Sequence, residues 1–145
     1  MDKYVTTLTN LAVIASLIFL ALEIRQNNEM MVLEARQGIS DARNDLVLTN
    51  MNSPSLIAAR GKALRGEELT YEEETQILLF FFAVFRNWQD QFLSYQAGAI
   101  TDAHMASEAK TWRRTIKQAP YIIAEWQRQK DALTPEFVAF MEVTD

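Results

Sequence analysis

An uncharged and mostly apolar run opens the chain. Residues Tyr4 to Leu22 hold no charged side chain, and Lys3 and Glu23 bracket them. A helix over these 19 residues rises about 28 Å, which is close to the hydrocarbon thickness of a bilayer. The pattern therefore predicts a single transmembrane helix, anchored by six large apolar side chains: Leu11, Ile14, Leu17, Ile18, Phe19 and Leu22.

Two other structures would also take this run out of water. A cleaved signal peptide needs small residues at its cleavage site, whereas the run ends in Leu20-Ala21-Leu22-Glu23-Ile24. The other is a buried central helix in a soluble bundle. Eight large apolar side chains lie between Leu11 and Leu22, and their burial is worth roughly 12–24 kcal/mol. The choice is therefore between lipid and a protein core, and we favour lipid.

A heptad repeat follows the apolar run. No proline occurs between Met1 and Pro54, so the same helix is predicted to continue to about Asn50 as a stalk. Large and small apolar residues alternate at the two inner positions of the repeat: Val32, Ala35, Ile39, Ala42 and Leu46. This stripe is typical of a helix that packs against its own domain. A self-association seam between copies of the chain is the alternative.

The rest of the chain is predicted to form a bundle of about five helices. Capping residues or prolines begin them at Ser53, Thr70, Thr101, Pro120 and Thr134. Gly66 and Gly98 are suited to end two of them. We find no alternation typical of a strand. The expected fold is thus all-α, with a membrane anchor and stalk over residues 1–50 and an acidic helical bundle over residues 51–145.

Aromatic side chains recur at helical spacing within these helices. Every residue from Ile77 to Phe85 is apolar, so this segment must be enclosed. Core packing is the expected role of the aromatic residues. The alternative is a pocket or a partner surface with these contacts: Phe80, Phe82, Phe85, Trp88, Tyr95, Trp112 and Trp126. In the same long helix, Asn87, Asp90 and Gln91 are within reach of one another and are predicted to form a polar network.

Charge and residue types narrow the possible chemistry. The net charge is −5, and no segment carries basic residues without acidic ones, so nucleic-acid binding is not expected. The chain has no cysteine and one histidine, His104. His104 and Glu108 offer two ligands on one helix face, whereas a transition-metal site usually needs three or four. Without a nucleophile elbow or a phosphate loop, we expect no enzymatic activity, cofactor or metal.

Three stretches carry a resemblance to known sequences. They are Leu20-Ala21-Leu22-Glu23-Ile24-Arg25-Gln26-Asn27-Asn28, then Asn87-Trp88, and then Tyr95 to Ile100 with Trp112. This layout resembles a group of small uncharacterised bacterial membrane-anchored helical proteins. The resemblance implies a single-pass protein of the bacterial inner membrane and carries no activity with it.

The position of the basic residues bears on orientation and on function. Lys3 precedes the apolar run, whereas Arg25 and Arg36 follow it, so an excess of one charge favours a cytoplasmic bundle. We expect an interaction protein, either an accessory subunit of a membrane complex or a self-assembling scaffold. Its partners would be the lipid bilayer and either its own copies or other membrane subunits. The alternative is a sensory module that binds a ligand or lipid between its aromatic-rich helices.

Overall fold

The computed structural model describes residues 2–143, with the side chains of residue 7 and of residues 9–143. Over this range the chain forms helices and no strand, which confirms the all-α prediction. The elements are α1 (Asp2–Met51), α2 (Pro54–Arg65), α3 (Tyr71–Gln96), α4 (Asp102–Ile116), α5 (Pro120–Gln129), the 3-10 turn η1 (Lys130–Ala132) and α6 (Pro135–Glu142).

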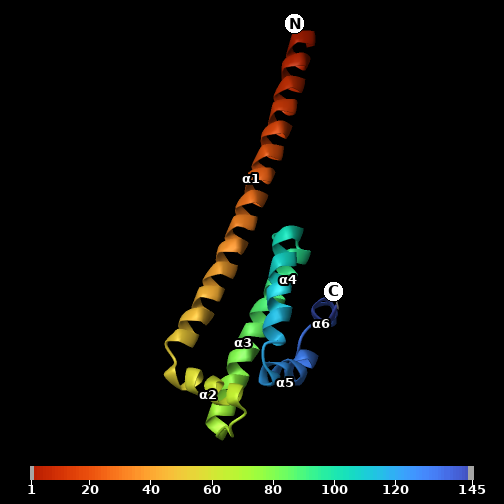
Figure 1. Cartoon of the computed structure of the whole chain (residues 1–145). Coiled ribbons are helices and arrows are strands. Elements are labelled where there is room, and N and C mark those ends of the chain that lie inside the picture. The colour runs from red at the N-terminus through yellow and green to blue at the C-terminus, as the bar shows by residue number, and fades with distance from the viewer. Residues whose placement is uncertain (1, 144–145) are drawn as a thin grey trace.

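Helix α1 runs without a break for 50 residues, which corresponds to about 75 Å. Its end at Met51 agrees with the predicted end near Asn50. In Figure 1 its N-terminal half projects away from the rest of the chain, and the other helices gather along its C-terminal half. A long N-terminal helix followed by a small helical bundle is therefore the architecture of this protein.

The predicted caps set the helix boundaries. The Oγ atom of Ser53 accepts a hydrogen bond from the N–H of Leu56 at the start of α2, and Gly66 ends that helix with a left-handed φ of 69°. Thr70 and Glu73 form the reciprocal capping box of α3, in which each side chain accepts from the backbone N–H of the other. These caps satisfy backbone groups that a helix end leaves unpaired.

Helix α3 is the central element of the bundle core. Its residues Phe81 and Phe85 are 2% and 1% exposed. The Phe85 ring meets Trp126 of α5 edge-on, with centroids 5.2 Å apart. Trp88 stacks on Trp112 of α4 at 5.5 Å. Contacts between rings of this size enclose the face of α3 that meets α4 and α5. The prediction that the whole segment from Ile77 to Phe85 is enclosed is wrong, because Leu79 and Phe82 on the outer face are 60% and 46% exposed.

The polar residues of α3 divide between the core and the surface. The amide nitrogen of Gln91 donates to Oδ1 of Asn87 at 2.7 Å, so these two residues form the predicted contact. Asp90 lies exposed, and no described hydrogen bond joins its carboxylate to Asn87 or Gln91, so the predicted network does not include it. The buried Gln89 instead accepts a hydrogen bond from the N–H of Thr134 at 2.7 Å, which ties the start of α6 to α3.

Candidate functional site

The apolar run at the start of α1 is uncovered. Every residue from 9 to 31 is exposed, and the eight large apolar side chains between Leu11 and Leu22 keep 51–67% of their surface exposed. No other described segment packs on this run, which excludes the buried central helix within a single copy of the chain. Over the described residues, α1 is the one helix long and apolar enough to cross a membrane.

One polar side chain interrupts the apolar run between Leu11 and Leu22, and it is satisfied within the helix. The hydroxyl of Ser16 donates to the carbonyl oxygen of Ala12 at 2.8 Å. A serine that bonds back to the preceding turn exposes no unpaired donor. The run is therefore compatible with a surrounding that offers no hydrogen-bond partners.

The heptad stripe of the stalk faces the protein's own bundle. From residue 32 to residue 50, the half-buried positions are the predicted stripe and Asn50, and the residues between them are exposed. Ile39 packs on the bundle core, and α1 contacts both α2 and α3. This arrangement supports packing of the stripe against its own domain. Ile39, which packs on the core, is therefore unavailable for a seam between copies.

Polar contacts from two arginines flank the stripe. The guanidinium of Arg43 lies 2.9 Å from Oε1 of Glu108 on α4 and donates to Oε1 of Gln91 on α3 at 3.3 Å. Seven residues earlier, Nε of Arg36 donates to the carbonyl oxygen of Ala99 at 3.2 Å. These bonds fix α1 against the α3–α4 connection and against both helices.

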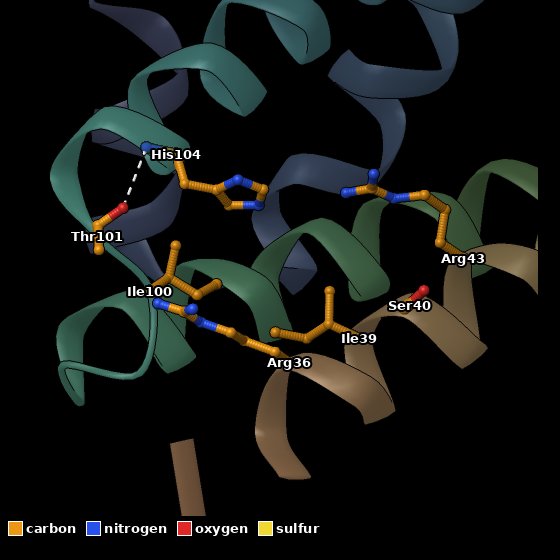
Figure 2. Close-up of a pocket in the computed structure, with 7 residues that line it drawn as sticks. All are labelled: Arg36, Ile39, Ser40, Arg43, Ile100, Thr101 and His104. Atoms are coloured by element: carbon orange, nitrogen blue, oxygen red, sulfur yellow. Dashed lines mark hydrogen bonds between the residues drawn. The ribbon is translucent and has the colours of Figure 1, made fainter. Parts of the chain in front are cut away.

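Two hollows remain between α1 and the bundle. The upper hollow has a volume of about 420 Å³ and lies beside the start of α4. Helix α1 lines it with Arg36, Ile39, Ser40 and Arg43, and the bundle lines it with Ile100, Thr101 and His104. Figure 2 shows the imidazole of His104 and the guanidinium of Arg43 pointing toward each other across this hollow.

The lower hollow has a volume of about 450 Å³. Its α1 wall includes Leu46 and Asn50, and its bundle wall includes Phe80, Trp88 and Trp112. Three of the seven predicted aromatic contacts therefore share one hollow. This hollow is an open groove between α1 and the bundle. The rings of Trp88 and Trp112 in its wall also belong to the hydrophobic core.

The other four predicted aromatic contacts lie elsewhere. Phe85 and Trp126 are buried in the core at 1% and 3% exposure. The hydroxyl of Tyr95 donates to Oδ1 of Asp102 at 3.0 Å, and this bond raises the pKa of Tyr95. Phe82 is 46% exposed and lies under the guanidinium of Arg86. The seven residues thus do not converge on a single pocket.

His104 lies on the surface beside Glu108, as its position predicted. Its Nε2 atom is 3.8 Å from Oε1 of Glu108, and its side chain is 54% exposed. Among the described residues, no three His, Asp or Glu side chains come together as a metal site would need. The chemistry available around His104 is that of charge and hydrogen bonding.

The residue pattern did not indicate Arg43, Ser40 or Ile100 as walls of the upper hollow, and it connected Arg36 only with orientation. A signal for the arginines exists, because Arg36 and Arg43 each follow an inner heptad position and are seven residues apart. Comparisons with protein families, with curated proteins and with solved structures find no match. The function must therefore be inferred from the geometry itself.

Proposed function

We propose that this chain is a single-pass membrane protein whose helical bundle stands outside the bilayer and makes protein–protein contacts. It would act as an accessory subunit of a membrane complex or as a self-assembling scaffold. One observation carries the proposal: the apolar run from Leu11 to Leu22 is exposed on all sides, at the free end of an unbroken helix.

The energetics of this run favour lipid over water. Eight large apolar side chains left in water would forgo roughly 12–24 kcal/mol of burial. A helix satisfies its own backbone hydrogen bonds, so it can be transferred into hydrocarbon without orphaned groups. Insertion into lipid would cover the apolar run without any further folding of the chain.

The segment between the apolar run and the bundle supports the contact function. The helix rises about 21 Å from Leu22 to Arg36, and residues 23–31 are exposed. Large apolar side chains with 54–65% exposure lie along it: Ile24, Met30, Met31 and Leu33. Met30 and Leu33 are three residues apart and therefore form an exposed strip on one face of α1. A helix from a second copy or from another membrane subunit would cover this strip, and exposed apolar side chains that adjoin one another are typical of contact surfaces.

A location in the bacterial inner membrane with a cytoplasmic bundle belongs to the same proposal. It rests on the sequence resemblance and on the one-charge excess of Arg25 and Arg36 over Lys3. The lack of cysteine makes orientation measurable, because Asp131→Cys would place one thiol on the bundle. That thiol is expected to resist an impermeant maleimide in intact cells and to react after lysis.

Membrane attachment is tested by fractionation with two matched variants. Ile14→Lys/Leu17→Lys places two charges in the middle of the run and costs about 5–7 kcal/mol in the bilayer. Asn27→Lys/Asn28→Lys adds the same charges to the stalk. We expect the natural chain and the stalk variant to stay in the membrane pellet after alkaline carbonate extraction, and the first variant to leave it. A natural chain found entirely in the supernatant would overturn the proposal.

The contact function is tested by sedimentation in mild detergent. The natural chain should sediment as an oligomer or with a second subunit. Met30→Lys/Leu33→Lys should release the monomer, because it places charge on the exposed strip. Val47→Lys/Leu48→Lys changes two residues of comparable exposure beside the bundle and should not release it. A strictly monomeric natural chain without a co-purifying subunit contradicts the proposal.

The lower hollow supports a second candidate function, the binding of an apolar ligand or lipid. Trp88 and Trp112 form part of its wall, and aromatic walls are common in such sites. Native mass spectrometry of the intact protein would detect a retained ligand. Thr111→Phe, which adds a ring to the same wall, should release it. Protein that retains no apolar molecule at all would rule this candidate out.

A further inference from the structure

The upper hollow has features that neither the membrane anchor nor the contact function requires. We infer that it is a binding site for a small dissolved anion that carries a phosphate or carboxylate group. The site itself lies in a part of the chain remote from the apolar run and does not depend on the proposed function, whereas the assignment of the anion to the aqueous phase rests on the proposed membrane anchor.

The charges around the hollow favour an anion. Arg36, Arg43 and His104 line it, and no carboxylate does. Glu108, beside the hollow, lies 2.9 Å from the guanidinium of Arg43. One carboxylate therefore faces two arginines and a histidine, within a chain whose net charge is −5. A local excess of positive charge in an acidic protein attracts an anion to this place.

Arg36 has donors left for a ligand. Its Nε atom donates to the carbonyl oxygen of Ala99, and this bond holds the side chain at the edge of the hollow. No described hydrogen bond or ion pair uses its two terminal nitrogens. A guanidinium held in this way presents a planar fork that fits a phosphate or carboxylate group with two parallel hydrogen bonds.

The remaining wall supplies both hydroxyl groups and apolar surface. The Oγ1 atom of Thr101 accepts from the N–H of His104 at 3.4 Å and keeps its own proton to donate, as does the hydroxyl of Ser40. Ile39 and Ile100 form apolar wall between the charged groups. The volume of about 420 Å³ is within the usual range for small-molecule sites. A ligand with one anionic end and a short apolar part fits this arrangement.

The position of the hollow along α1 decides between two sources of the anion. Arg36 lies about 21 Å beyond Leu22 along the helix, whereas the headgroup layer extends only about 5–8 Å beyond the hydrocarbon. A lipid headgroup of the anchoring bilayer does not reach the hollow. The anion is therefore expected to come from the aqueous phase.

The single histidine makes the site directly observable. His104 is the only histidine of the chain, so its imidazole signals in a ¹H–¹³C NMR spectrum need no assignment. Inorganic phosphate is the probe, titrated into the intact protein in neutral detergent at constant pH and ionic strength. We expect the His104 signals to shift and to saturate.

Two matched arginine variants test whether the hollow is responsible. Arg36→Ala removes the unpaired fork and should weaken phosphate binding about tenfold or more. Arg25→Ala removes the same charge from the stalk, where Arg25 pairs with Glu29, and should leave binding unchanged. A shift that never saturates, or one that both variants weaken equally, would mean a general ionic effect and would overturn the inference.

A second experiment, in lipid bilayers, distinguishes a dissolved anion from a lipid headgroup. The protein is placed in nanodiscs of phosphatidylcholine and, separately, of phosphatidylglycerol, both without phosphate. The His104 signals should be the same in the two lipids. A shift that appears in phosphatidylglycerol and disappears in Arg36→Ala would identify a headgroup as the ligand and would overturn the assignment to a dissolved anion.

Discussion

Arg43 of α1 and Glu108 of α4 form an ion pair of 2.9 Å that joins the stalk helix to the bundle. The same guanidinium nitrogen donates to Gln91, and the amide of Gln91 donates to Asn87. A line of polar contacts thus runs from α1 across α3 and α4, beside the apolar stripe. The stalk and the bundle are therefore one packed unit, and the exposed part of α1 continues from it as the same helix.

The Arg43–Glu108 pair should contribute measurably to folding. Its side chains are 46% and 17% exposed, so we expect a coupling free energy of about 0.5–1 kcal/mol, the upper part of the range for such pairs. A double-mutant cycle of Arg43→Ala and Glu108→Ala, read from urea unfolding by tryptophan fluorescence in mild detergent, measures it. The equivalent cycle on the exposed pair Arg25–Glu29 is the control and should leave bundle unfolding unchanged. Equal coupling in both cycles would contradict the structural role of the first pair.

Phe85 and Phe82 are three residues apart on α3 and should respond very differently to truncation. Phe85→Ala removes a ring that is 1% exposed and in contact with Trp126, so it should lower the free energy of unfolding by about 3–5 kcal/mol. Phe82→Ala removes a ring that is 46% exposed and should cost less than about 1 kcal/mol. The same urea unfolding measures both, and similar losses would show that the core is not where the structure places it.

The contacts of the Glu73 carboxylate at the start of α3 should make the stability of the protein depend on pH. The hydrogen bond from Lys62 at 2.6 Å, together with that from the N–H of Thr70, holds the pKa of Glu73 below its usual value. A carboxyl whose pKa is lower in the folded state adds stability that is complete above its unfolded pKa of about 4.3. That stability is lost as the pH falls through the folded value.

Substitution of Glu73 isolates this contribution. Glu73→Gln keeps a side chain that can accept from the Thr70 N–H but removes the charge that faces Lys62. At pH 7 it should lower the urea midpoint, and the difference from the natural chain should disappear as the pH falls toward 3. Glu72→Gln, at an exposed neighbouring position, should lower the midpoint less. A difference for Glu73→Gln that is independent of pH would exclude the charged contact as its cause.

The boundaries of the helices were predictable from the sequence because local interactions determine them. The cap at Ser53, the capping box at Thr70 and the left-handed turn at Gly66 each involve residues within a few positions of one another. The unbroken length of α1 likewise follows from the absence of proline before Pro54. Residues that lie close in sequence carry this information whatever the rest of the chain does.

The cover of each apolar face was not predictable in the same way. The repeat that includes Val32, Ile39 and Leu46 has the same pattern whether a second copy or the chain's own α3 packs on it. The upper hollow depends on a contact between α1 and α4 that places Arg43 opposite His104, 61 positions later in the sequence. No spacing along one helix encodes such a meeting, so these residues emerged only with the tertiary structure.

Replacing two glycines by alanine should change the stability of the protein in opposite directions. A Cβ atom added at Gly66 or at Gly38 would meet nothing within 4 Å, so packing does not separate the two sites. Gly66 has a φ of 69°, where an L-residue with a side chain costs about 1–2 kcal/mol. Gly38 lies in the interior of α1, where alanine is better than glycine by about 0.5–1 kcal/mol.

Circular dichroism during heating measures the two effects on the same signal. Gly66→Ala should lower the melting temperature of the intact protein in detergent, because the cap that ends α2 becomes strained. Gly38→Ala should raise the melting temperature or the helical signal of α1, because its unfolded state loses conformational freedom. If Gly38→Ala instead destabilised the protein, α1 would have to bend or contact a partner closely at this point, and the straight stalk between anchor and bundle would be wrong.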